Sequence, residues 1–244
     1  MARNWTYEDI AKRIDHSLLG PDLSINQLEE GCRVAVAYQV ASVCIKPSAV
    51  SLAASWLAGS GVEIGTTIGF PHGGHRTDVK IFEAEQALID GATELDMVVN
   101  IGFVRSNRWS EVRQDIAGVV QASHKAGALT KVIFENCYLN EAQKIRLCEI
   151  CGDVGADFVK TSTGYGTGGS TDEDLILMRK ISPATVKLKA AGGVRDLDSV
   201  IRVMELGCDR IGLSRTAEIL DEHRKRLGLD SITVSRETGG DSSY

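Results

Sequence analysis

The sequence lacks long apolar runs and any excess of basic residues. No apolar stretch approaches the roughly 18 residues that a membrane-spanning helix needs, and no basic segment followed by an apolar one opens the chain. Lysine and arginine together number 27 against 33 aspartates and glutamates, which gives a net charge of −6. An acidic balance of this kind argues against nucleic acid or an anionic membrane as a partner. We therefore expect neither.

Cysteine is also sparse, with six residues in a chain of 244. Without a leader, these are expected to be reduced thiols of a cytoplasmic protein and not a disulfide framework. Cys148 and Cys151 form a C-x-x-C pair, but they lie in a helical pattern with no second ligand pair nearby. His72 and His75 supply two ligands at most. We expect no metal and no cofactor.

What the sequence does contain is a regular alternation of short apolar segments with amphipathic helical ones. A short helix is expected at 7–13. The predicted strands are 14–19, 40–46, 62–70, 93–100, 131–136, 157–161, 186–190 and 210–214. Alternation of this kind implies parallel strands with right-handed crossovers, and eight units predict a single-domain (β/α)8 TIM barrel over 1–230. An open doubly wound sheet would normally stop at five to seven strands. A polar, flexible tail is expected at 231–244.

Polar side chains gather where the predicted strands end, which is where barrel enzymes place their catalytic groups. They are Asp15, Ser17, Cys44, Lys46, Asp96, Asn100, Glu135, Lys160, Thr161 and Lys189. Lys160 follows Phe158 and Val159 directly, so its amine should sit near apolar walls, and desolvation lowers the pKa of a lysine. A lone lysine at a strand end more often extends to solvent. Two lysines and an aspartate that meet at the open end of one barrel, which we call the mouth, are harder to explain as side chains that extend to solvent.

This set of residues fits imine chemistry. Lys160 is the predicted nucleophile, and Lys189 is a neighbouring ammonium that keeps the Lys160 amine unprotonated. Asp96 is the predicted acid and base that moves protons between intermediates. Strands 157–161 and 186–190 are neighbours, so the two lysines can approach closely.

A second pattern points to phosphate. Gly192 and Gly193 follow the seventh predicted strand, and Gly212 to Ser214 end the eighth, just before a helix. Loops after strands seven and eight, together with a helix N-terminus, form the usual phosphate site of such barrels. The alternative is that these glycines only let helices pack close to strands.

Several motifs are spread over nearly the whole chain. They are IDHSLL (14–19), VCIKP (43–47), TTIGFPHG (66–73), FEA (82–84), GATELDMVVNIG (91–102), ADFVKTSTGY (156–165), LMR (177–179), KAAGGVR (189–195) and RIGLS (210–214). In these segments the chain resembles the deoxyribose-phosphate aldolase family of class I aldolases. The resemblance implies the roles already given to Lys160, Lys189 and Asp96. It also places Asp15, Ser17 and Cys44 in the lining of the active site, and it suggests that the last residue, Tyr244, enters the site from a mobile tail.

Three departures from the family pattern stand out. Lys46 stands where an uncharged residue is usual, Arg215 and Thr216 follow Ser214 where serine and glycine are common, and Ala191 replaces a small hydroxyl residue. We expect Lys46 and Arg215 to add positive charge to the mouth.

The resemblance implies reversible cleavage of 2-deoxyribose 5-phosphate to glyceraldehyde 3-phosphate and acetaldehyde. Two alternatives stay open. One is an imine-forming aldolase acting on a different phosphosugar or sugar acid, and the other is a catalytically silent barrel that binds a phosphorylated metabolite. The resemblance also implies that the chain could form a homodimer or a larger homo-oligomer.

Overall fold

Eight parallel strands close into a barrel in the computed structural model, which describes residues 5–234. Each strand pairs with its neighbours in sequence, and β8 pairs with β1. The strands are β1 (Ile14–Leu18), β2 (Ser42–Ile45), β3 (Glu63–Ile68), β4 (Glu94–Val98), β5 (Leu129–Ile133), β6 (Phe158–Lys160), β7 (Lys187–Ala191) and β8 (Arg210–Leu213). The predicted single-domain (β/α)8 barrel is confirmed.

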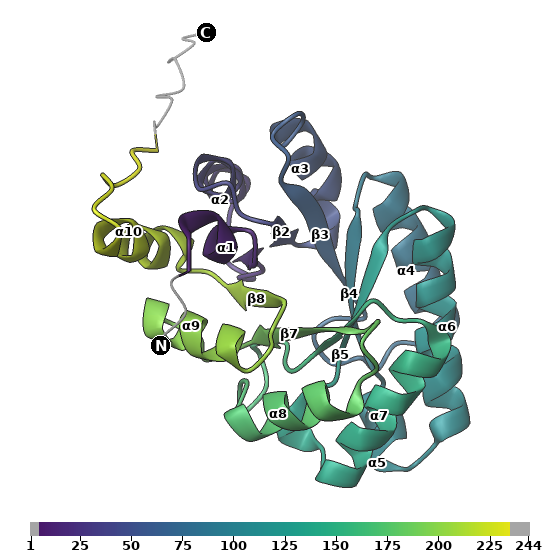
Figure 1. Ribbon diagram of the computed structural model, residues 1–244. Coiled ribbons are helices and arrows are strands. Elements are labelled where there is room, and N and C mark those ends of the chain that lie inside the picture. The colour runs from purple at the N-terminus through teal and green to yellow at the C-terminus, as the bar shows by residue number, and fades with distance from the viewer. Residues whose placement is uncertain (1–4, 235–244) are drawn as a thin grey trace, which may run out of the picture.

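Helices surround the strands on the outside, as Figure 1 shows. They are α1 (Tyr7–Ala11), α2 (Ile25–Ala37), α3 (Val50–Trp56), α4 (Thr77–Ile89), α5 (Ile101–Arg105), α6 (Trp109–Lys125), α7 (Glu141–Val154), α8 (Asp172–Ile181), α9 (Leu197–Glu205) and α10 (Thr216–Arg226), with single turns of 3-10 helix at Pro47–Ala49 and Asn136–Tyr138. Ser24 and Asn140 begin α2 and α7 with reciprocal capping boxes, each satisfying backbone N–H groups that the first turn leaves free.

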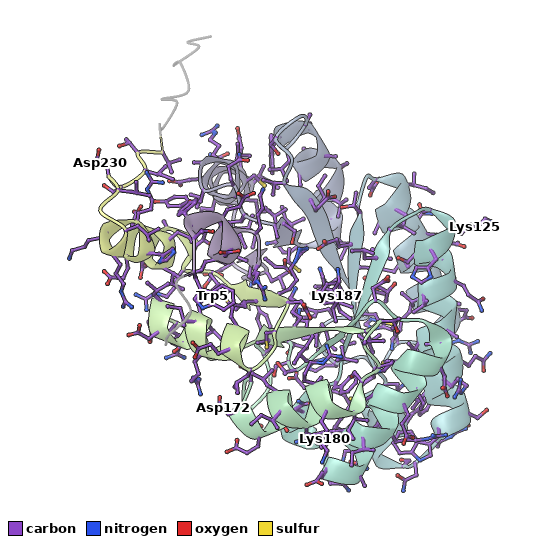
Figure 2. All side chains as sticks on the ribbon, in the orientation of Figure 1. Trp5, Lys125, Asp172, Lys180, Lys187 and Asp230 are labelled. Atoms are coloured by element: carbon purple, nitrogen blue, oxygen red, sulfur yellow. The ribbon has the colours of Figure 1, made fainter. Side chains whose placement is uncertain are left out.

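The apolar core lies between the strands and the helices. Val43, Leu95, Val132, Val159 and Leu188 are fully buried at alternate strand positions, where they meet the helices. Figure 2 shows the side chains filling the interior of the barrel, while the labelled Lys125 and Lys180 lie on the outer helices α6 and α8. The opposite strand face points to the barrel axis and carries charged side chains.

Two local features differ from the sequence expectation. The fifth strand occupies 129–133 instead of 131–136, because Glu135 has a left-handed backbone with φ of 57° and turns the chain into a 3-10 turn. Asn100 was expected to end the fourth strand. Instead it caps the short helix α5, and its side chain accepts a hydrogen bond from the Phe103 N–H at 3.1 Å.

The end of the barrel where the strands begin is crossed by α1. Residues of α1 and of the α1–β1 turn share a cavity of about 510 Å3 with the first residues of β4, β5, β6, β7 and β8. Within the described residues, no helix is long and apolar enough to cross a membrane. Residues 231–234 form neither helix nor strand, and the rest of the predicted tail, including Tyr244, lies outside the described residues.

Candidate active site

A cavity of about 650 Å3 opens at the carboxyl ends of the strands. Ten predicted site residues line it: Asp15, Ser17, Cys44, Lys160, Lys189, Gly192, Gly193, Gly212, Ser214 and Arg215. Asp96 lies just below its floor, fully buried. The topology therefore gathers residues from six different strands or strand ends at one mouth, which is the arrangement that barrel enzymes use for chemistry.

Lys160 and Lys189 both donate hydrogen bonds to one carboxylate oxygen. They are Cα partners in the parallel register of β6 and β7. The Lys160 Nζ donates to Oδ2 of Asp96 at 2.6 Å, and the Lys189 Nζ donates to the same oxygen at 2.7 Å. Lys160 is 3% exposed and Lys189 is 1% exposed. A proton can therefore move between the two amines through a single carboxylate.

The two lysines differ in their pKa. Burial lowers the pKa of Lys160, the Asp96 carboxylate opposes this shift, and the neighbouring Lys189 ammonium lowers the pKa further. The net direction for Lys160 is downward. Burial also acts to lower the pKa of Lys189, but the carboxylates of Asp15 and Asp96 outweigh it, so the pKa of Lys189 is raised. At neutral pH, Lys189 is the charged partner and Lys160 is the amine that loses its proton more readily.

Asp96 stays ionised. Burial acts to raise its pKa, but the ammonium groups of Lys131, Lys160 and Lys189 outweigh burial and hold the pKa well below the usual range. Cys44 lies beside it, with Sγ 4.0 Å from the Asp96 Oδ2. Burial and the Asp96 charge raise the pKa of the Cys44 thiol to about 11. Cys44 is thus a neutral thiol in the wall of the cavity and not a nucleophile.

The lysine–aspartate centre is part of a larger buried network, which we call the ionic cluster. Its members are Asp15, Glu94, Asp96, Lys131, Lys160, Lys189 and Arg210. Lys131 Nζ lies 2.5 Å from Glu94 Oε2 and 3.1 Å from Asp96 Oδ1. Sequence reasoning missed Glu94, Lys131 and Arg210. Glu94 stands two residues before Asp96, a spacing that places both side chains on one face of a strand.

The loops after β6 and β7 approach each other closely at the mouth. Gly192 has φ of 76° and Gly193 has φ of 87°, a backbone conformation that side chains resist. A Cβ on Gly169 would lie 2.4 Å from the Gly192 carbonyl oxygen, so this contact requires glycine. Helix α10 begins at Thr216, directly after Ser214 and Arg215. The N-terminus of α10 lies here, and its first backbone N–H groups have no intrahelical acceptor, which suits an anion such as phosphate.

Lys46 and Thr161 lie outside the cavity, contrary to expectation. The Lys46 Nζ donates to the carbonyl oxygens of Gly20 at 3.2 Å and Leu23 at 2.9 Å, so it ties down the loop after β1. Thr161 is fully buried, and its hydroxyl donates to the Ala191 carbonyl at 3.2 Å. Both residues hold neighbouring backbone in place. Lys46 therefore donates its ammonium protons to the loop that walls the mouth and does not itself line the cavity.

Arg215 does lie at the rim. It forms an ion pair with Glu218 one turn further along α10 and contacts the carbonyl of Arg195 at 3.5 Å. Arg195, Thr163 and Tyr165 also line the cavity, although sequence reasoning did not single them out. Their signal was available, because each follows a predicted catalytic strand within six residues.

Glu135 anchors the loop after β6. Its carboxylate accepts hydrogen bonds from the Thr163 N–H at 3.2 Å and from the Thr163 hydroxyl. Tyr165, two residues on, packs edge-to-face against Phe70 with ring centroids 5.4 Å apart. Tyr165 thus forms part of the wall of the mouth, and Phe70 packs against its ring. Within the described part of the chain, no group of three or more histidine, cysteine, aspartate or glutamate side chains is placed to hold a metal ion.

The comparisons with known proteins agree with this geometry. Residues 10–212 match the family model described as DeoC/LacD family aldolase. The chain is 54% identical over 241 residues to a deoxyribose-phosphate aldolase of Rhodopirellula baltica, covering 99% of both chains. It is 45% identical over 218 residues to a deoxyribose-phosphate aldolase of Thermococcus gammatolerans, covering 88% of this chain and 97% of the relative.

Solved structures give the same result. The tetrameric deoxyribose phosphate aldolase of Aeropyrum pernix superposes with a TM-score of 0.84 at 30% identity, over 91% of this chain and 93% of that one. The family match spans most of the barrel and includes the segments that carry both lysines and the aspartate. The chain therefore belongs to the DeoC/LacD family of aldolases.

Proposed function

We propose that this protein is a class I aldolase that reversibly cleaves 2-deoxyribose 5-phosphate to glyceraldehyde 3-phosphate and acetaldehyde through an imine on Lys160. One observation carries the proposal. A buried amine with a lowered pKa shares the Asp96 carboxylate oxygen with the charged Lys189. Binding alone needs no such amine, which argues against a silent phosphate-binding barrel.

In the cleavage direction, the neutral Lys160 amine attacks the aldehyde carbon of the open-chain sugar and forms a carbinolamine. Loss of water, with a proton supplied through Asp96, gives the iminium ion. The bond between the second and third carbons then breaks. Its electron pair moves into the enamine, the proton of the third-carbon hydroxyl passes to a base, and glyceraldehyde 3-phosphate leaves. Protonation of the enamine and hydrolysis release acetaldehyde and restore the amine.

Asp96 and Lys189 suit the proton transfers in this sequence. The Asp96 Oδ2 is within 2.7 Å of both amines, so a proton moved from one side can be replaced from the other without bulk water. General acid and base groups in such positions contribute about 10²- to 10⁴-fold to a rate. We assign Asp96 and Lys189 as the relay pair.

The sugar phosphate is proposed to bind at Gly192, Gly193, Gly212 and Ser214. These residues line the mouth on the β7 and β8 side, with the start of α10 nearby. Arg215 is placed at the rim, where its guanidinium can supplement the backbone N–H groups. The positive charge of Arg215 also suits a related reaction, in which the imine chemistry acts on another phosphosugar or on a sugar acid.

We also propose where the protein works, its oligomeric state and its metabolic role. All six cysteines are free, four of them with a pKa raised by burial to between about 11 and about 12, which suits a reducing cytoplasm. A homo-oligomer is proposed because the relative from Aeropyrum pernix is tetrameric. The substrate implies a role in breaking down deoxyribonucleosides.

Trapping tests the function. The protein is incubated with 2-deoxyribose 5-phosphate, borohydride is added, and the adduct is located by peptide mass spectrometry. An adduct on Lys160, with acetaldehyde released in an unreduced sample, is expected. An adduct only with another aldehyde or keto acid would keep the imine and change the substrate. No adduct with any carbonyl compound would rule out the aldolase function.

A further inference from the structure

The ionic cluster reaches far beyond the three groups that the proposed chemistry uses. Glu94 and Arg210 are the first residues of β4 and β8, so they lie at the opposite end of the strands from the mouth. Both line the cavity of about 510 Å3 under α1, and neither lines the cavity at the mouth. Arg210 is nevertheless connected to the catalytic lysines, because its Nε lies 3.0 Å from Asp15 Oδ1 and Asp15 Oδ2 lies 2.5 Å from the Lys189 Nζ.

The charges of the cluster do not balance when every member is ionised. The cluster holds four cationic side chains and three carboxylates, so the fully ionised form carries one excess positive charge. An uncompensated charge in the interior is costly, and a buried group then changes its protonation state instead. One proton must leave for the cluster to be neutral.

Geometry decides which cation loses that proton. Lys131 forms ion pairs with three carboxylates of the cluster, Asp15, Glu94 and Asp96. Lys189 and Arg210 each form ion pairs with two carboxylates of the cluster. Lys160 forms an ion pair with one carboxylate, Asp96. The least stabilised cation is therefore the lysine that must be neutral to attack a carbonyl.

We propose that Glu94 and Arg210 are positioning residues for catalysis, which set the charge count of the cluster and thereby fix Lys160 as its neutral member. This inference rests on the proposed function for its catalytic meaning. Removing the Arg210 charge leaves three cations for three carboxylates, so the cluster is neutral with Lys160 protonated. Removing the Glu94 charge leaves a larger positive excess, which drives the Lys160 proton off more strongly.

The surroundings of the cluster do not cancel this effect. Lys160 faces Asp96 on β4, Lys189 on β7 and the neutral thiol of Cys44 on β2, with Asp15 on β1 also in the lining of the same cavity. Below Arg210, the other charged residues of the lower cavity are three cations and three acids, Lys12, Arg13, Lys187, Glu8, Asp9 and Asp209. Their formal charges sum to zero, so the outer layer adds no net charge.

Three variants test the proposal: Arg210→Gln, Glu94→Gln and the double variant with both changes. The rate of borohydride trapping of acetaldehyde on Lys160 is measured against pH. The acid limb of the profile is expected to move up by on the order of one pH unit in Arg210→Gln and down in Glu94→Gln. In the double variant, which restores the charge count, the limb should return close to that of the unmodified protein.

Matched controls separate charge count from structural damage. Arg210→Lys keeps the charge and is expected to keep the profile. Lys187→Gln removes an exposed cation from the same end of the barrel and should leave the profile unchanged. If Arg210→Gln does not fold, the downward shift expected in Glu94→Gln and its reversal in the double variant still decide. Coinciding profiles, or shifts of the same sign in both single variants, would overturn the proposal.

A second readout keeps this inference distinct from the proposed function. The rate at which acetic anhydride labels Lys160 depends on its unprotonated fraction and needs no aldolase chemistry. If borohydride traps no acetaldehyde on Lys160 of the unmodified protein, the proposed function fails, and the labelling profiles still test the charge count. If acetaldehyde is trapped there but acetic anhydride labels Lys160 at the same rate in every variant and at every pH, only the charge-count inference fails.

Discussion

Lys160 and Lys189 occupy paired positions on β6 and β7, and their Nζ atoms lie 2.6 and 2.7 Å from one oxygen of Asp96. In a parallel ladder, paired residues point to the same face. The fold therefore creates the contact between the lysines, and their different carboxylate partners give them different protonation states. The predictions that follow depend on this difference.

Lys160→Met should abolish aldol cleavage and the borohydride-trapped adduct, because the only proposed nucleophile is removed. Both are measured with 2-deoxyribose 5-phosphate as substrate. Lys46→Met is the matched control, since Lys46 also follows a strand directly but does not itself line the cavity, and its ammonium contacts the backbone carbonyls of Gly20 and Leu23. The control should keep its adduct. An adduct that persists on another lysine in Lys160→Met would contradict the assignment.

Asp96→Asn should lower kcat by about 10²- to 10⁴-fold, the usual contribution of a general acid or base. The amide cannot accept and release the proton that passes between the two lysines. Steady-state kinetics at several pH values provide the measurement. A variant that keeps more than a tenth of the activity would show that the relay runs through another group.

The pH profile of kcat/KM should have an acid limb set by Lys160. Its pKa is lowered by burial and by the Lys189 ammonium, so the limb should fall below the value of about 10.4 for an ordinary lysine. Activity should rise with pH as the amine loses its proton. The profile is measured under conditions where the protein stays folded, which circular dichroism checks. A limb at the ordinary lysine value would refute the proposed environment.

His16 should make the protein less stable in acid. Burial lowers the pKa of His16 to about 4 from an ordinary value of 6.5, and its Nδ1 lies 2.7 Å from the Thr216 hydroxyl. Between pH 4 and pH 6.5, the His16 side chain is therefore protonated in the unfolded chain and neutral in the folded protein. The free energy of unfolding should fall by about 3 kcal/mol as the pH drops from 6.5 to 4.

Urea unfolding at pH 7 and pH 4.5 measures this loss, and His16→Gln is the comparison. The free energy of unfolding of His16→Gln should fall less between these two pH values than that of the unmodified protein, whatever its value at pH 7. An equal loss in both proteins would assign the acid sensitivity to other groups.

Arg215→Ser should raise KM for 2-deoxyribose 5-phosphate several-fold with little change in kcat, because an exposed charge contributes about 1 kcal/mol or less. Cleavage of unphosphorylated deoxyribose should not change. Glu218→Gln releases Arg215 from its ion pair and should lower KM for 2-deoxyribose 5-phosphate. If KM for the phosphorylated sugar is the same in Arg215→Ser, Arg215 has no part in phosphate binding.

Much of the fold followed from the sequence because short apolar segments alternate with helical ones eight times, and most of the helices end near a glycine. Errors arose where one side chain redirects the backbone. The left-handed Glu135 ends β5 one residue before the end of its apolar run, and the Asn100 side chain starts a helix that the pattern did not indicate. Neither effect has a periodic signal.

The candidate site was less accessible to sequence reasoning than the fold. Lys160 ends β6, where barrel enzymes place catalytic groups, and Asp96 and Lys189 lie within β4 and β7. Lys46 also stands at a strand end, but backbone carbonyls that only the folded loop brings near satisfy its ammonium. Lys131 is buried within β5 and Arg210 begins β8, and whether a strand charge points to the axis or to a helix depends on the register of the closed barrel.

The placement of α1 has a practical consequence for attaching the protein to a solid support. Exposed Glu8 lies at the end of the barrel opposite the mouth, so a thiol introduced there would orient every molecule with its mouth toward the solution. Cys137 is already exposed and lies beside the loop that carries Gly166, at the mouth end. Immobilisation through Glu8→Cys would therefore need Cys137→Ser as well, or part of the layer would be bound with its mouth against the support.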